Sequence, residues 1–235
     1  MRGVSILLLG LALFSGCALV GENPLDRKRG AIVLVFDTRT EKDVKGLRGM
    51  LSEQGARATV FVAGRISRRT AGMILDLQGD GHEVGLSGLQ GIEPKQYAPM
   101  FGQQKYFQDE IVTQVLDARK QGLNLRYFLL KSVSKGKKEA LTLPEFLVSK
   151  GFTRVVHKMP PEMQPYARPA HEKTGSLVNV YEMTPGNFSA AQIAKLAKDN
   201  EILIVAPNRQ VLPALLREAR AQNVPFATLS DLRTE

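Results

Sequence analysis

AIVLVFDT, residues 31–38, is an apolar run of six residues that ends abruptly on Asp37 and Thr38. Its β-branched residues and its lack of polar alternation predict a strand buried on both faces of a sheet. A helix-like segment follows at 42–54, and a second apolar run, ATVFV, occupies 58–62. The chain therefore begins its fold with strand, helix and strand.

The same rhythm continues through the next segment of the chain. A helical segment at 67–77 leads into GDGHEVGLS at 79–87, which has the character of a third strand. Strands that alternate with helices in this way predict a parallel sheet. In such sheets the functional site lies at the carboxyl ends of the strands. Asp37, Thr38 and Ser87 stand at two of these predicted ends.

The alternation extends to the end of the chain. Further strands are predicted at 125–130, 152–156, 177–183, 201–206 and 225–228. Helices are predicted at 106–121, 141–150, 189–199 and 212–222, with Ser189 as an N-cap. About seven β/α units result, so the fold class is α/β and the expected architecture is an irregular, deformed (β/α)7-type barrel. A doubly wound open sheet is the alternative.

The first residues resemble an export signal rather than a part of the fold. Arg2 precedes an apolar stretch at 4–14 that is too short to span a bilayer as a stable helix. LFSGC at 13–17 resembles the lipobox of bacterial lipoproteins, in which the cysteine becomes diacylated and forms the new N-terminus. Cys17 is the only cysteine, so no disulfide competes for it. An ordinary signal peptide with an incidental cysteine is the alternative.

This resemblance divides the chain into three parts. Residues 1–16 are the predicted lipoprotein signal peptide, 17–30 the lipidated N-terminus and a short polar tether, and 31–235 one barrel domain. Ala18 follows the cysteine, which resembles lipoproteins sorted to the outer membrane. We therefore expect localisation in the bacterial cell envelope, at the periplasmic face of the outer membrane more than at the inner membrane.

The charge of the chain indicates the kind of partner. Removal of residues 1–16 takes away Arg2 and no acidic residue, so the formal charge of +9 falls to +8. A basic protein suits an anionic partner such as a cell-wall polymer or a membrane surface, although the charge also serves solubility alone. Export and an aromatic content of 6% disfavour a nucleic-acid partner.

Three motifs, in this order, carry a resemblance to a known family. VFDTR at 35–39, ATVFV at 58–62 and GHEVG at 81–85 resemble the polysaccharide deacetylase family, that is, the NodB homology domain or carbohydrate esterase family 4. Its patterns are T-F-D-D-G, A-T-F-F-V and G-H-E-I-G, the last continued by x-H-[ST]-x-x-H. The closing stretch at 202–232 also resembles that of the family. The resemblance implies a deformed, NodB-like (β/α) barrel.

The resemblance also implies a chemistry that this sequence keeps only in part. Enzymes of the family hold a divalent metal with one Asp and two His, and the metal polarises an acetamide carbonyl and activates water. Carried over, the metal Asp falls on Thr38, and the two His fall on Leu86 and Gln90. Leucine has no lone pair, and Thr and Gln do not replace a carboxylate and an imidazole. The ancestral metal site is therefore predicted to be lost, and no metal cofactor is expected.

Other family positions differ as well. Asp37 matches the general base of the family and is the remnant catalytic residue. The arginine that orients this base falls near 129–131, and the late histidine falls near 205–207. Arg39 and Ser87 are candidates to line a retained glycan groove.

The polar candidates also have structural interpretations. Asp37 is placed to cap the following helix or to pair with Arg39. His82 lies in the Gly-His-Glu turn, where a packed, hydrogen-bonded histidine is expected. A metal site that joins His82 and Asp37 with His157 and His171 has no recognised ligand spacing.

Three functional classes follow. The favoured one is an exported, lipid-anchored, polysaccharide-deacetylase-like protein that is catalytically inactive and binds peptidoglycan or another envelope polysaccharide. The second is an active polysaccharide N-deacetylase, a hydrolase of carbon–nitrogen amide bonds, with an atypical site. The third is a structural protein whose groove is filled by side chains, which Leu86 in the former metal position would favour.

Overall fold

The computed structural model describes residues 30–90, 102, 104–130, 146–159, 177–183, 189–198 and 202–231. Within them, eight strands form one sheet and pair only in parallel. The strands are β1 (Ala31–Thr38), β2 (Thr59–Val62), β3 (Glu83–Leu86), β4 (Tyr127–Leu130), β5 (Arg154–Met159), β6 (Leu177–Met183), β7 (Ile202–Pro207) and β8 (Phe226–Ala227).

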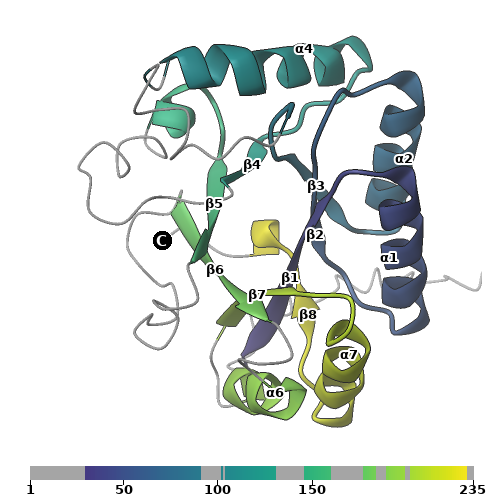
Figure 1. The fold of residues 1–235 in the computed structure, drawn as a ribbon. Coiled ribbons are helices and arrows are strands. Elements are labelled where there is room, and N and C mark those ends of the chain that lie inside the picture. The colour runs from purple at the N-terminus through teal and green to yellow at the C-terminus, as the bar shows by residue number, and fades with distance from the viewer. Residues whose placement is uncertain are drawn as a thin grey trace, which may run out of the picture.

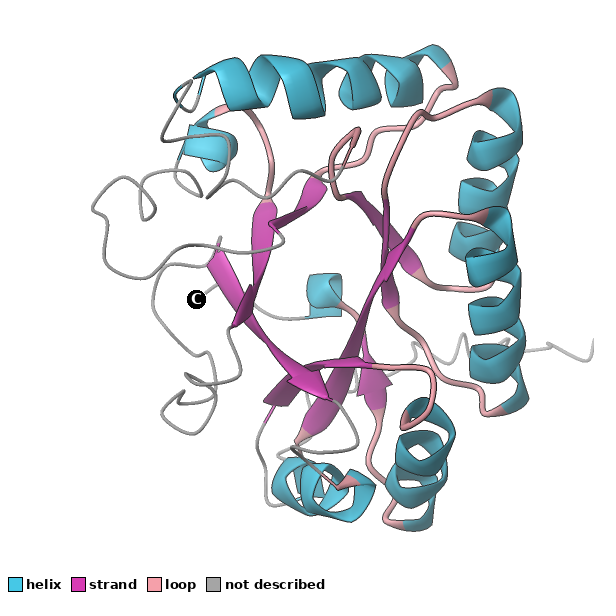
Figure 2. Cartoon of the chain, in the orientation of Figure 1, coloured by secondary structure: helices cyan, strands magenta, loops and turns pink. Residues whose placement is uncertain are grey.

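The sheet closes into a ring. Strands β2 to β7 are neighbours in chain order, and β1 then pairs with β7 on one side and with β2 on the other. The short β8 pairs with Ile32 and Val33 of β1, whereas β2 pairs with β1 from Val35 to Thr38. Figures 1 and 2 show the strands around a central axis, with the α-helices outside and the short helical turn η3 (Leu229–Asp231) within the ring. The predicted barrel is thus confirmed, and the doubly wound open sheet is wrong.

Strand β1 organises the ring because both of its faces are buried. Ala31, Val33 and Val35 pack inside the barrel, whereas Ile32 and Leu34 pack in the layer between the sheet and the helices. Side chains alternate between the two faces of a strand, which explains why the sequence shows a continuous apolar run. Each fully buried aliphatic side chain of this kind contributes about 1.5–3 kcal/mol.

The helices lie close to their predicted positions. They are α1 (Glu41–Glu53), α2 (Arg68–Gly79), α4 (Thr113–Lys120), α6 (Ala190–Lys198) and α7 (Leu212–Ala221). Ser189 caps α6 as predicted, because its hydroxyl accepts a hydrogen bond from the Gln192 N–H at 3.2 Å. Within the described residues, no helix is long and apolar enough to cross a membrane.

The helix predicted at 106–121 differs from expectation. It begins with a π-helical segment, η1 (Phe107–Val112), and continues as α4. A π turn holds more residues than an α turn, so it changes which side chains face the sheet. Glu110 and Ile111 are both buried in this segment. A buried acid was not predicted here.

Several predictions lie outside the described residues. These are the signal peptide, Cys17 and the tether up to residue 29, as well as most of the helix predicted at 141–150, of which 146–149 are described.

Candidate functional site

Asp37 and Ser87 form a polar pair at the barrel mouth, which is the end of the barrel at which the parallel strands finish. Asp37 lies near the end of β1, and Ser87 directly follows β3. The Ser87 hydroxyl donates a hydrogen bond to Asp37 Oδ1 at 2.7 Å. Ser87 is buried, and Asp37 is half-buried. Two of the residues that the sequence analysis selected are therefore brought into direct contact.

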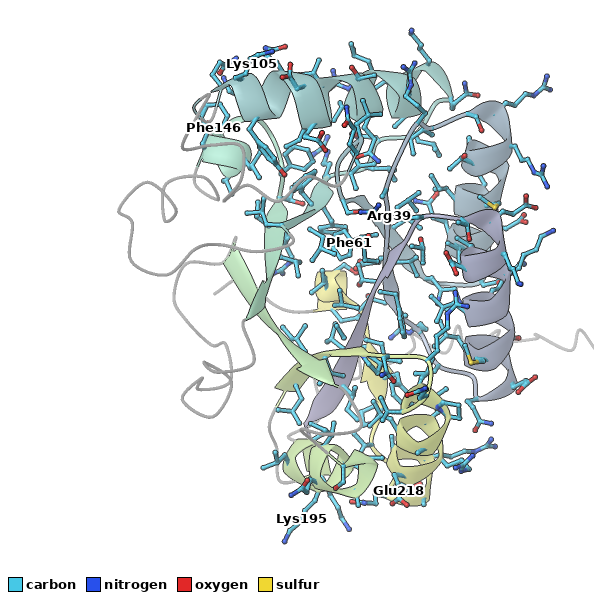
Figure 3. The ribbon with its side chains drawn as sticks, in the orientation of Figure 1. Arg39, Phe61, Lys105, Phe146, Lys195 and Glu218 are labelled. Carbon is cyan, nitrogen blue, oxygen red and sulfur yellow. The ribbon has the colours of Figure 1, made fainter. Side chains whose placement is uncertain are left out.

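Phe61 forms an apolar floor beneath this pair. It is fully buried and packs with Val33, Val35 and other side chains of the barrel interior. In the sheet register Phe61 is level with Asp37 on one side and with Gly85 on the other. Figure 3 labels Phe61 within the ring of strands. The Asp37–Ser87 pair is thus backed by a buried aromatic side chain.

Thr38 faces the opposite way from Asp37. Its hydroxyl donates a hydrogen bond to the Phe61 carbonyl oxygen at 3.1 Å, and its side chain is buried. Successive side chains of a strand point to opposite faces, which separates Thr38 from the barrel interior. Thr38 is therefore not placed to act together with Asp37.

The structure also places Leu86 away from the mouth. Leu86 is fully buried in the layer between sheet and helices, in the same apolar cluster as Ile32 and Leu34. Ser87 is the side chain at this strand end that faces Asp37. The predicted site position Leu86 is therefore corrected to Ser87. The prediction that Leu86 fills the mouth is wrong.

Gln90 is exposed, and Glu110 binds the backbone of this segment. Its N–H donates a hydrogen bond to Glu110 Oε2 at 3.0 Å, and the Leu89 N–H donates one to the Glu110 carbonyl oxygen at 2.8 Å. Glu110 itself is buried. This contact was not predicted from the sequence, because an acid within an amphipathic helix is ordinarily solvated.

Gln114 is a second positioning residue that sequence reasoning missed. Its Nε2 donates hydrogen bonds to the carbonyl oxygens of Val62 at 2.8 Å and Gly64 at 2.9 Å. Its Oε1 accepts one from the Gly88 N–H at 3.1 Å. The side chain is fully buried, so it joins the ends of β2 and β3 to α4.

The two structural interpretations have different outcomes. Thr40, not Asp37, is the N-cap of α1, so the capping role of Asp37 is wrong. His82 is buried, and its Nδ1 accepts a hydrogen bond from the Ala58 N–H at 3.2 Å. Burial lowers the pKa of His82, against an opposing effect of Asp80. The packed histidine at the start of β3 is therefore confirmed.

A basic cleft lies next to the mouth, between the starts of α1 and α2. It has a volume of about 180 Å³, and Arg39, Arg65 and Arg69 line it. Asp117 holds Arg65 through two hydrogen bonds, and Glu41 pairs with Arg69. Within the described residues Arg39 forms no ion pair, and Figure 3 labels it near the end of β1. Among the described residues, Arg39 is thus the arginine of this cleft that has no carboxylate partner.

The donors at the mouth do not fit the divalent metal that the fold family implies. Asp37 supplies one carboxylate and Ser87 a neutral hydroxyl that already donates to it. Catalytic zinc sites use three protein ligands, which are mainly imidazoles, carboxylates and thiolates. In the part of the chain that the structure describes, no three His, Cys, Asp or Glu residues are grouped to hold a metal. His171 and the side chain of His157 lie outside that part.

Comparison with solved structures supports the fold. No family model matches the sequence, and no curated protein matches it. The polysaccharide deacetylase Bc1974 from Bacillus cereus is 20% identical with a TM-score of 0.54, covering 85% of this chain and 92% of its own. PdaA from Bacillus subtilis, a family 4 carbohydrate esterase, is 14% identical with a TM-score of 0.54, covering 87% and 81%.

A third similar structure is the catalytic domain of a peptidoglycan N-acetylglucosamine deacetylase from Eubacterium rectale. It is 15% identical with a TM-score of 0.51, and the match covers 88% of this chain and 90% of that domain. At such identities the similarity establishes the architecture, an irregular NodB-like (β/α) barrel, and not the activity.

Proposed function

We propose that this chain is a lipid-anchored protein of the bacterial cell envelope that binds an N-acetylated glycan, peptidoglycan above all, without hydrolysing it. One observation carries the proposal: the side chain that directly follows β3 and contacts Asp37 is the Ser87 hydroxyl, and not one of the imidazole, carboxylate or thiolate ligands that catalytic zinc sites use.

The mouth has the chemical groups for sugar binding. The Asp37 carboxylate accepts hydrogen bonds at more than one site, so it is able to hold sugar hydroxyl or amide N–H groups while Ser87 orients it. Hydrogen bonds to an ionised group are stronger than those between neutral groups. The buried Phe61 ring packs inside the barrel next to this pair. These polar groups support sugar binding.

The basic cleft supports an anionic glycan. Peptidoglycan carries carboxylates on its peptides, and Arg39 lies beside the mouth without an ion pair among the described residues. Guanidinium groups bind carboxylates through paired hydrogen bonds. A glycan strand seated at Asp37 would thus extend a carboxylate toward Arg39.

The binding test compares two aspartates. We expect Asp37→Ala to weaken binding to insoluble peptidoglycan and to N-acetylated chito-oligomers by at least about tenfold, because a hydrogen bond to a charged group contributes about 1.5–3 kcal/mol. Asp76→Ala is the matched control, because Asp76 is an exposed acid on α2 that pairs with Arg48. Equal affinity of the native chain and both variants would refute glycan binding at the mouth.

The alternative, an active N-deacetylase with an atypical site, is tested in parallel. Acetate release from chito-oligomers is measured with added zinc or cobalt, for the native chain and for Asp37→Asn. We expect no release above the metal-only background. Release that Asp37→Asn abolishes would establish the enzyme and overturn the non-catalytic proposal.

Anchoring is proposed from residues 1–30 alone. We expect intact-mass analysis of the chain from bacterial envelopes to show a diacylated N-terminus at Cys17, and Cys17→Ala to remain unmodified. Fractionation would then place the native chain in the outer membrane. An unmodified cysteine in the exported native chain would contradict this part of the proposal.

A further inference from the structure

A second, larger groove lies beside α4, between this helix and residues 123–126 and 150–152. Its volume is about 490 Å³, within the usual range of ligand sites. Apolar side chains form most of its wall, among them Phe107, Val115, Leu125 and Phe152. Leu116 also lines it and is 48% exposed.

The charged residues that line this groove are basic within the part of the chain that the structure describes. Arg119, Arg126 and Lys150 line it together with the apolar side chains, and among the described residues no Asp or Glu does. Within the described residues none of the three forms an ion pair with a carboxylate. The Lys150 ammonium lies 5.0 Å from the centre of the Phe146 ring and 5.9 Å from that of Phe107, which holds it above the apolar wall.

An apolar wall with a cationic margin matches one class of ligand. Hydrocarbon would fill the apolar part, and an anionic headgroup would lie against the basic side chains. We propose that this groove binds an anionic phospholipid at a membrane surface. It is distinct from the mouth, because it faces outward and shares no residue with the Asp37–Ser87 pair.

The position of the groove favours a lipid over an acidic protein segment. Residues 123–126 and 150–152 line it and lead directly into β4 and β5, so it reaches the end of the barrel at which the parallel strands begin. Strand β1 starts at Ala31 at that same end. If Cys17 is acylated, the 17–30 tether spans at most about 45–50 Å from the bilayer to this end. Only this argument from the length of the tether depends on the proposed acylation of Cys17.

The absence of tryptophan from the chain provides a direct test. Leu116→Trp introduces a single fluorophore into the groove, and the full chain is mixed with vesicles of phosphatidylcholine alone or with equal phosphatidylglycerol. We expect an emission blue shift and quenching by brominated acyl chains with phosphatidylglycerol and little change without it. Leu75→Trp is the control, since Leu75 is 56% exposed on α2, away from the groove.

Charge reversal separates this site from an unspecific basic surface. In the Leu116→Trp background, Arg119→Glu and Arg126→Glu are each expected to weaken the phosphatidylglycerol response roughly fivefold or more per position. Arg68→Glu, at an exposed position of α2, is the matched control and should change it little. Circular dichroism confirms that each variant is folded.

Two outcomes would overturn the proposal. One is an equal response of the Leu116→Trp and Leu75→Trp reporters, and the other is a blue shift with an acidic amphipathic peptide but none with phosphatidylglycerol. Neither outcome depends on glycan binding, because Asp37→Ala should leave the lipid response unchanged.

Discussion

Gly85 sets the depth of the barrel mouth. A Cβ atom at this position would lie 2.5 Å and 2.7 Å from two carbons of the Phe61 ring and 2.8 Å from the Tyr127 carbonyl oxygen. The ring is fully buried and the carbonyl belongs to the backbone, so neither is able to move away easily. The final glycine of GHEVG is thus what permits the Phe61 floor.

We therefore expect Gly85→Ala to lower the free energy of unfolding by about 1–3 kcal/mol, the usual cost of overpacking. Gly46→Ala is the control, because a Cβ there meets no atom within 4 Å. Gly46 lies inside α1, where alanine is favoured by up to about 1 kcal/mol, so this variant should be more stable. Urea unfolding measures both, and equal stability of Gly85→Ala and the native chain would show that Phe61 is free to shift.

His82 makes stability depend on pH. The pKa of His82 is lowered from its ordinary value of 6.5, first because burial disfavours the charged ring. Protonation of Nδ1 would also remove the acceptor for the Ala58 N–H. Near pH 6.5 the unfolded chain therefore binds more protons at this residue than the folded one. Its stabilising contribution is complete above that pH and is lost as the pH falls through the folded-state pKa.

The measurement compares the native chain with His82→Asn in urea unfolding between about pH 5 and pH 8. We expect the difference in unfolding free energy to be constant at the upper end and to shrink at the lower end. Other titrating groups are common to both proteins, so they largely cancel in the difference. A difference that does not change with pH would contradict a lowered pKa of His82.

At the scale of elements, Gln114 joins three parts of the fold. Gln114 lies in the first turn of α4. Its amide group donates hydrogen bonds to two carbonyl oxygens at and after the end of β2 and accepts one from an N–H after β3. Buried backbone groups that lose their partners cost about 1–3 kcal/mol each. The loop that carries Ser87 and Gln90 is therefore held in part by Gln114, beside its contacts with Glu110.

We expect Gln114→Leu to destabilise the chain by about 1–3 kcal/mol, because it leaves the buried Gly88 N–H without its partner and removes hydrogen bonds to the Val62 and Gly64 carbonyl oxygens. Hydrogen exchange should increase most at 62–64 and 87–90. Gln121→Leu, at an exposed position after α4, is the control and should have little effect. Unchanged exchange at 87–90 in Gln114→Leu would show that other contacts hold this loop.

The sequence predicted the elements well and the orientation of their side chains less well. Continuous apolar runs and the Ser189 cap identified most strands and helices to within a few residues. A strand that is buried on both faces has no polar alternation, so the sequence does not say which of Leu86 and Ser87 faces the barrel axis. The π turn before α4 has no sequence signal either, and it is what buries Glu110.

At the scale of the whole molecule, the two ends of the barrel differ. At the end where the strands finish, Asp37 and Ser87 face the mouth. At the other end the C-terminal segment covers the interior: the Leu229 N–H donates to Thr59 Oγ1 at 3.2 Å, and the Ser230 N–H donates to Glu83 at 3.0 and 3.1 Å. The Asp37–Ser87 pair thus lies at the end of the barrel opposite this cover.

The C-terminal cover joins residues that are far apart in the chain, which makes the barrel one cooperative unit. Leu229 is fully buried in the barrel interior. The hydrogen bond from its N–H to Thr59 spans 170 positions. Its neighbour Asp231 forms an ion pair with Arg57 at 3.2 Å. Loss of this cover should thus destabilise the strands near the start of the chain as well as those at its end.

We expect Leu229→Ala to lower the free energy of unfolding by about 2–5 kcal/mol, as for other buried leucines. Leu75→Ala is the control: Leu75 is 56% exposed, so its change should stay within about 0.5 kcal/mol. Hydrogen exchange should rise together in β1, β2 and β8 if the ring opens as a whole. A rise confined to 226–231 would mean that the cover unfolds separately and that the ring of β1 to β7 is stable without it.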